Sequence, residues 1–186
     1  MKLRSIFATT LAIAALCASG AFAADKAQKQ AEIHKATQAS MEKFYKAQPR
    51  IKGEVQAAPG YAVFTTYGVS FLVGGAGGTG LAHDKASSKD YYMNMAQASA
   101  GLMAGIGQRD TLVVFKSQKA FDQFVNKGWE FGGGGAIAAG AAGHTAGGGS
   151  GEQTIGDALT YTLTRNGLDV GGALQGTKFW KDDDLN

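Results

Sequence analysis

The chain has 186 residues, a formal net charge of +3 and 28 glycines. This length suits one domain with a sizeable core, and the nearly neutral charge argues against nucleic acid as a partner. With a single cysteine, the chain cannot form an internal disulfide framework.

The first 23 residues have the pattern of an export signal. Lys2 and Arg4 make the start positive, residues 6–16 form a short apolar stretch, and residues 21–23 fit a small-x-small cleavage site. Cleavage there would leave residues 24–186 as a single domain and lower the formal charge from +3 to +1. The predicted location is therefore the periplasm.

Attachment of lipid at Cys17 is a second way of processing this signal. A lipobox usually has a small residue before the cysteine, whereas this chain has Leu16. Because the apolar stretch is also too short for a spanning helix, soluble export is favoured over a lipoprotein.

Residues 25–48 predict an amphipathic helix. Ile33, Met41 and Phe44 recur on one side at helical spacing, while lysines gather on another. Such a helix either packs its apolar stripe on a sheet or lies on a membrane surface, where lysines attract anionic lipid and aromatic rings insert. The candidate lipid-binding residues are Lys35, Lys43, Phe44, Tyr45, Lys46, Arg50 and Lys52.

Pro49 and Pro59 bracket a predicted connecting segment, because proline disfavours helix in the residue before it. Runs of β-prone residues then predict strands over 61–67, 70–75, 79–82, 91–107, with breaks, and 111–116. Ser117 is a candidate N-cap for a short helix that ends at Lys127, with Gly128 as its stop.

The last third of the chain alternates between glycine-rich and β-prone segments. Extended structure is predicted over 129–131, and the nearly continuous Gly and Ala of 132–151 end in a predicted mobile loop at 145–151. Residues 159–164 alternate apolar and threonine side chains and are followed by Asn166-Gly167, a typical tight-turn pair. This pattern predicts a β-hairpin.

Most of the predicted strands follow one another without helices between them, which favours antiparallel pairing. The predicted fold class is α+β. It is a mainly antiparallel sheet over about 60–180, sandwich- or barrel-like, with the N-terminal amphipathic helix and one short internal helix.

Few residues are arranged for chemistry. Residues 75–80 match G-x-G-x-x-G, but the helix that dinucleotide binding requires does not follow, so a glycine-rich hairpin is preferred. His34, His83 and His144 lack metal-ligand spacing, and the carboxylates of 182–184 are interpreted as a solvated tail. The prediction is a protein without catalytic residues, metal or cofactor, and not an enzyme.

Several glycine-rich and β-prone segments, in this order and spacing, resemble the SYLF domain, also called the Ysc84 domain. They are 58–64, 74–80, 101–108, 110–115, 131–132, 138–143 and a closing hairpin that includes Tyr161, Gly167, Leu168, Gly171, Leu174 and Gly176. The resemblance covers most of the chain from the first helix to about Phe179. The segment 65–69 is shorter than the connection usual in the family.

The resemblance implies a phospholipid-binding module, since eukaryotic relatives bind phosphoinositides and some yeast relatives also engage actin. We expect no tail or adjoining domain for actin contacts, so actin is not an expected partner. The predicted function is non-enzymatic binding of phospholipid at the bacterial cell envelope. The alternative is a structural or stress-related envelope protein that binds an unidentified protein partner through edge strands.

Overall fold

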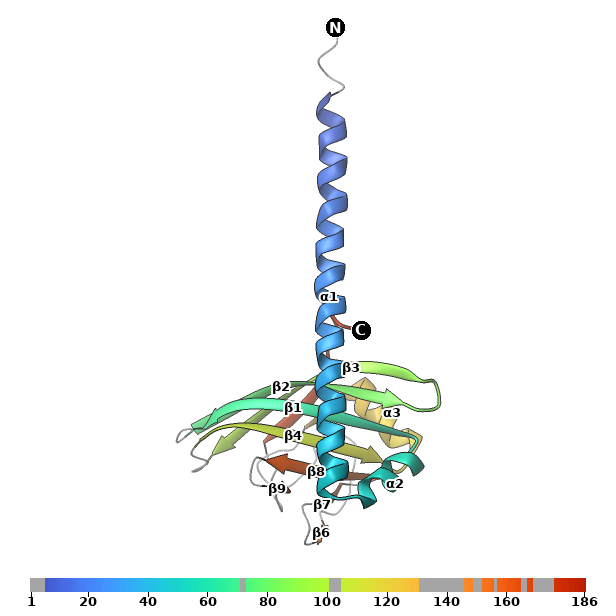
Figure 1. Cartoon of the computed structure of the whole chain (residues 1–186), viewed down its shortest axis with the longest axis vertical. Coiled ribbons are helices and arrows are strands. Elements are labelled where there is room, and N and C mark those ends of the chain that lie inside the picture. Colours follow the sequence, from blue (N-terminus) through green and yellow to red (C-terminus); the bar gives the residue numbers. More distant parts are fainter. Residues whose placement is uncertain are drawn as a thin grey trace.

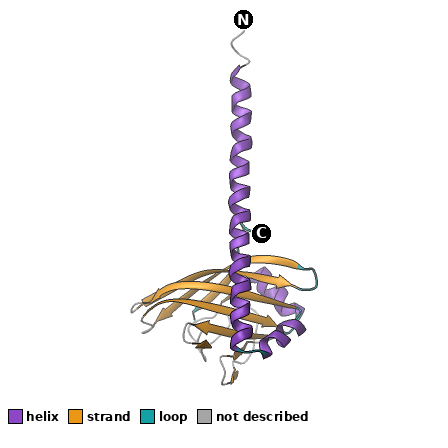
Figure 2. Ribbon diagram, viewed as in Figure 1, coloured by secondary structure: helices purple, strands orange, loops and turns teal. Residues whose placement is uncertain are grey.

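The computed structural model describes residues 6–70, 73–100, 105–130, 146–148, 152–155, 157–164, 167–168 and 176–186. These residues form one antiparallel sheet with helices on both faces (Figures 1 and 2). The helices are α1 (Ile6–Ala47), α2 (Arg50–Ala57) and α3 (Gln118–Lys127). The strands are β1 (Gly60–Ser70), β2 (Val73–Asp84), β3 (Lys89–Ala100), β4 (Gly105–Phe115), β5 (Trp129–Glu130), β6 (Ala146–Gly148), β7 (Glu152–Ile155), β8 (Ala158–Thr164), β9 (Gly167–Leu168) and β10 (Thr177–Lys181).

The strand order is β5-β10-β3-β2-β1-β4-β8-β7-β6, with β9 paired to β8. The central strand β1 pairs along its length with β2 on one side and β4 on the other, so that Phe64 lies between Gly80 and Thr111. Every pairing is antiparallel. The predicted α+β class with a mainly antiparallel sheet is confirmed.

The N-terminal helix crosses one face of the sheet and extends beyond it (Figure 1). Its end at Ala47 agrees with the prediction, whereas its start at Ile6 lies well before the predicted start at Asp25. Ile33, Met41 and Phe44 are buried on the sheet side, as helical periodicity required. The stripe therefore packs on the sheet, which was the first of the two interpretations.

The segment after Pro49 forms α2, so the predicted connecting segment is wrong. Pro49 has φ −57° and ψ −29°, which suits the start of a helix. Proline disfavours helix in the residue before it, and here that residue is Gln48, which lies outside both helices. Ile51 and Val55 are four residues apart and buried, so α2 has its own apolar face on the sheet.

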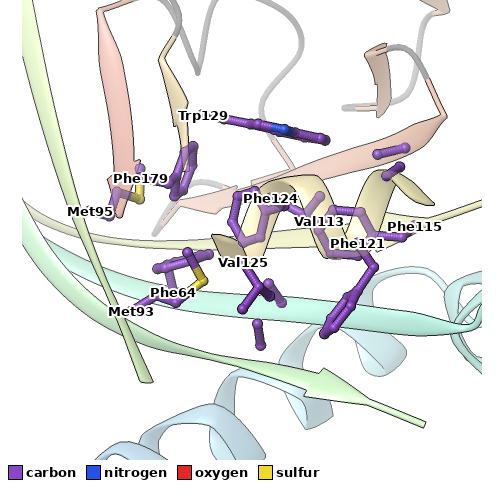
Figure 3. Packing of buried hydrophobic residues seen from close by; sticks show 14 residues of the cluster. Phe64, Met93, Met95, Val113, Phe115, Phe121, Phe124, Val125, Trp129 and Phe179 are labelled. Carbon is purple, nitrogen blue, oxygen red and sulfur yellow. The ribbon is translucent and has the colours of Figure 1, made fainter. Parts of the chain in front are cut away.

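The opposite face of the sheet is covered by α3. Ser117 caps this helix as predicted, accepting a hydrogen bond from the Ala120 backbone N–H at 3.3 Å, and Gly128 ends it with φ +69°. The helix buries Phe121 and Phe124 in an aromatic core (Figure 3). The other members of this core are Ala62, Phe64, Ala82, Met93, Met95, Val113, Phe115, Ala120, Val125, Trp129, Ala158 and Phe179.

Two strand predictions need correction. Ala146–Gly148 forms β6 through its pairing with β7, so this part of the predicted mobile loop is a strand. The C-terminal hairpin is confirmed in β8 and β9, but Gly167 pairs with Thr164 and is therefore a strand residue and not a turn residue. Of the predicted glycine-alanine segment 132–151, residues 132–145 and 149–151 lie outside the described residues.

Glycine at Gly80 permits close packing inside the sheet. A Cβ there would lie 2.4 Å from the Phe64 ring and 2.3 Å from the Val63 carbonyl oxygen. Gly80 belongs to the G-x-G-x-x-G match. The whole match lies within β2, so it neither opens a helix nor forms the predicted glycine-rich hairpin. Gly80 therefore serves the packing of Phe64.

Candidate functional site

The predicted lipid-binding residues lie in two different environments. Phe44 is fully buried between α1 and the sheet, and Tyr45 is partly buried against the same cluster. Burial raises the pKa of Tyr45 above its ordinary value. Insertion of Phe44 into lipid, one of the sequence expectations, is excluded while α1 stays on the sheet.

Lys43 also has a structural contact. Its ammonium lies 2.9 Å from Asp110 Oδ2, and the Asp110 side chain is only 4% exposed. Thr65 donates to the other oxygen of this carboxylate at 3.1 Å and shares a 3.2 Å hydrogen bond with Ser40. Lys43 therefore ties α1 to β4 and has its charge offset by Asp110, while Ser40 ties α1 to β1.

The remaining predicted cations are exposed. Lys46, Arg50 and Lys52 lie at the corner where α1 leads into α2, and Lys35 lies farther back along α1. Arg50 is 3.9 Å from Glu54, whereas Lys35, Lys46 and Lys52 form no ion pair with the side chains that the structure describes. No helix among the described residues has an apolar stretch long enough to cross a membrane.

A groove of about 890 Å³ lies beside α1 on the same face of the sheet. Its floor includes Gly77 and Thr79 of β2, Ala96 of β3 and Trp180 of β10, and Ala36 lies on the α1 side. The lining is mainly apolar, and Trp180 is 39% exposed. A Cβ at Gly77 would meet no atom within 4 Å, so the absence of a side chain there keeps the floor open.

Charged residues at the groove are predominantly acidic. Glu32, Asp182 and Asp184 contribute carboxylates, and Lys29 is the one cation among the described lining residues. Lys29 is 2.8 Å from Asp25. A hydrogen bond from Lys29 to Asp25 and the attraction of nearby carboxylates raise the pKa of this lysine.

The C-terminal residues form one end of the groove. The Asn186 side chain accepts from the Tyr92 backbone N–H at 3.1 Å and donates to the Tyr92 carbonyl at 2.7 Å, as a paired strand would. Gln30 of α1 donates to the Leu185 carbonyl at 2.8 Å, and Leu185 packs on Ile33. These contacts hold the acidic tail between β3 and α1.

His34 and His83 both lie beside Asp90 and do not line the groove, and His144 lies outside the described residues. His83 Nδ1 is 2.6 Å from Asp90 Oδ1, and His34 Nε2 lies 3.3 Å from Asp90 Oδ2 and 3.0 Å from the Tyr92 hydroxyl. His83 therefore faces the neighbouring strand and not the tail carboxylates. Among the described residues, no three His, Cys, Asp or Glu side chains are placed so that they could hold a metal ion.

Sequence reasoning did not find the groove. Its floor consists of small residues of β2 and β3 and of Trp180 of β10, and their common face is set by the register of these three strands. Trp180 was a usable signal, because a tryptophan between Phe179 and Lys181 alternates with the buried Phe179. That alternation places Trp180 on the face opposite the aromatic core.

Comparison with known proteins identifies the type of domain. Residues 96–186 match the family model Ysc84, described as "Las17-binding protein actin regulator". Residues 96–186 of this chain belong to the Ysc84 family. It is also 33% identical over 167 residues to Beta cell expansion factor A of Aeromonas veronii, a match that covers 86% of this chain and 60% of that protein. The chain thus spans about three fifths of the length of this relative.

The resemblance predicted from the glycine-rich segments is confirmed by this match. The Ysc84 match begins in β3 and includes β4, α3, β8 and β10, so it contains both the Trp180 part of the groove and most of the aromatic core. Membership in the family supports a lipid-binding type of role in general.

Proposed function

We propose that this Ysc84 protein is a non-enzymatic phospholipid-binding protein of the bacterial cell envelope, held on anionic lipid by exposed cations of α1 and α2. The observation that carries the proposal is the corner at Lys46, Arg50 and Lys52, where three cations lie within a short stretch of chain and all are exposed. Each contributes on the order of 1 kcal/mol at an anionic surface. Lys35 extends the cationic surface along α1.

The mode of attachment differs from that of an inserting amphipathic helix. Phe44 belongs to the core, and the outward side of α1 carries Gln38, Ala39 and Glu42 between Lys35 and Lys46. Such a surface offers charge but little apolar area. The proposal is therefore electrostatic attachment at the α1–α2 corner, without deep insertion.

Edge-strand binding of another protein receives less support. The terminal strands of the described sheet are β5, with two residues, and β6, with three. Short edge strands present few free backbone groups for pairing with a partner. Las17 binding and actin regulation belong to the description of the family model and are not proposed for this chain.

Co-flotation with liposomes tests the proposal. The chain is mixed with neutral or anionic vesicles at low and high salt, and we expect binding that requires anionic lipid and weakens with salt, because exposed charges are screened within about 10 Å at 0.1 M. A Lys46→Glu, Arg50→Glu and Lys52→Glu variant should lose most of the bound fraction.

The matched control reverses three charges away from the corner, Lys116→Glu, Lys119→Glu and Lys127→Glu near α3. This control should float like the native chain. If both variants lost the same share of the bound fraction, the loss would follow from net charge and not from the corner. Unchanged flotation of the corner variant would contradict the proposal.

A further inference from the structure

We propose that the groove beside α1 binds a single amphiphile whose head group carries a positive ammonium, with its hydrocarbon chain along the floor. This inference rests on the proposed lipid-binding function and names a lipid class for a second site. It follows from the shape of the groove, from its apolar floor and from the sign of the charge around it.

The size and lining suit one amphiphile molecule. The groove volume of about 890 Å³ falls in the range of about 300–1,000 Å³ common for small-molecule sites, which are mostly apolar with a few polar groups. Ala36, Ala96 and Trp180 supply apolar surface, while Gly77 leaves the floor open. Thr79 adds a polar group to this floor.

The charges select the head group. Glu32, Asp182 and Asp184 outnumber Lys29 in the lining, and Lys29 already pairs with Asp25. An anionic head group would meet net repulsion here, whereas an ammonium gains attraction from the carboxylates. The Trp180 indole adds to this preference, because an aromatic face attracts cations.

The groove and the cationic corner therefore select opposite charges. Lys46, Arg50 and Lys52 lie at the end of α1 that leads into α2, and none of them lines the groove. A membrane containing both anionic and ammonium-bearing lipids would engage the two sites separately. Variants at one site should leave the other intact.

The test titrates the full chain with dodecylphosphocholine and with dodecyl phosphate, each below its micelle concentration, by calorimetry. We expect one dodecylphosphocholine per chain, bound at least tenfold more tightly than dodecyl phosphate. Tryptophan emission should shift to shorter wavelength on binding, and Trp180→Phe should abolish the shift, because the other tryptophan, Trp129, is buried.

Gly77→Leu and Gly53→Leu form a matched pair. A Cβ at either glycine meets no atom within 4 Å, but Gly77 lies in the groove and Gly53 lies on the exposed side of α2. Gly77→Leu should weaken dodecylphosphocholine binding at least tenfold, and Gly53→Leu should leave it unchanged. The double variant Glu32→Gln, Asp184→Asn should reduce the preference for dodecylphosphocholine over dodecyl phosphate at least threefold.

Equal affinity for the two amphiphiles, or unchanged binding by Gly77→Leu, would overturn the inference. Flotation of Gly77→Leu on anionic vesicles separates the groove proposal from the proposed attachment at the corner. Loss of amphiphile binding with native flotation supports the groove as a site of its own. Native dodecylphosphocholine selectivity without any anionic flotation would instead reject the proposed attachment at the corner.

Discussion

On the α3 face of the sheet, Phe64, Phe115 and Phe124 pack ring against ring, whereas the α1 face combines an apolar cluster with polar ties and an open groove. The α3 face is held by non-directional burial of aromatic surface. The α1 face relies in part on directional contacts such as Lys43 with Asp110. A helix attached in this way can cover part of a sheet and leave the adjoining part open.

This difference explains why both proposed lipid sites lie on the α1 face. Aromatic packing around α3 leaves Phe124 fully buried, so ligand entry there would require the core to separate. On the α1 face, the groove floor continues past the helix over Gly77 and Ala96. Stability and ligand binding are thus assigned to opposite faces of one sheet.

The largest expected effect compares Phe124→Ala with Phe44→Ala. Both side chains are fully buried, but Phe124 also contacts the rings of four aromatic neighbours, Phe64, Phe115, Trp129 and Phe179. We expect Phe124→Ala to lower the free energy of unfolding by about 3–5 kcal/mol. Phe44→Ala should cost about 1 kcal/mol less, because aromatic pairs add to simple burial.

Urea unfolding at constant pH measures both values. Equal slopes of free energy against urea would show that the two variants expose the same surface on unfolding. A larger loss for Phe44→Ala than for Phe124→Ala would contradict the assignment of the main stabilising core to the α3 face.

The next effect concerns the ion pair between Lys43 and Asp110. Lys43→Met leaves the buried Asp110 carboxylate without its cation, and we expect a loss of about 1–3 kcal/mol, moderated by the hydrogen bond from Thr65 and by the exposure of Lys43. Lys35→Met is the matched control, because Lys35 is exposed and forms no ion pair with described side chains. It should change stability by less than about 0.5 kcal/mol.

Hydrogen exchange locates the loss in the same pair of variants. Lys43→Met should increase exchange in α1 while α3 keeps its protection, since the two helices lie on opposite faces. If exchange became equally faster in α1 and α3, the two faces of the sheet would unfold as one unit. The contrast between the α1 face and the α3 face would then be wrong.

Local patterns in the sequence predicted the α3 side well. Ser117, the apolar spacing of Phe121 and Phe124, and Gly128 are all signals within one helix, and each has its expected role. The first helix was predicted with the correct end and apolar stripe for the same reason. Short-range periodicity was sufficient wherever one element determined its own contacts.

Long-range pairing explains what sequence reasoning missed. Lys43 matched the pattern of a solvent-facing lysine, and only the fold brings Asp110 of β4 to its ammonium. The groove likewise requires three strands in register, and α2 depends on apolar contacts that stabilise a short helix after Pro49. No spacing within one segment contains this information.

A smaller effect tests the α3 cap. Ser117 Oγ accepts from the Ala120 N–H and donates to Asp157 at 2.9 Å, so Ser117→Ala should lower the free energy of unfolding by about 1 kcal/mol. Ser117→Thr keeps the hydroxyl and should recover most of this loss. If thermal unfolding placed Ser117→Thr level with Ser117→Ala, the cap would not be the source of the stability.

The smallest effect belongs to the turn between β2 and β3, outside both cores. The Ser87 hydroxyl donates to Asp84 Oδ2 at 2.6 Å and the Ala86 N–H donates to Oδ1 at 3.0 Å, which holds the pKa of Asp84 below its ordinary value. The folded chain therefore binds this proton less tightly than the unfolded chain. The stability from Asp84 is complete above the ordinary carboxyl pKa and is lost as pH falls through the lowered value.

Asp84→Asn should consequently destabilise the chain more at about pH 6 than at about pH 3, as measured by urea unfolding at both values. Asp183→Asn, at an exposed position of the tail, should show no such change with pH. A constant cost of Asp84→Asn across this range would mean that the turn is stabilised by hydrogen-bond geometry alone, independently of the carboxylate charge.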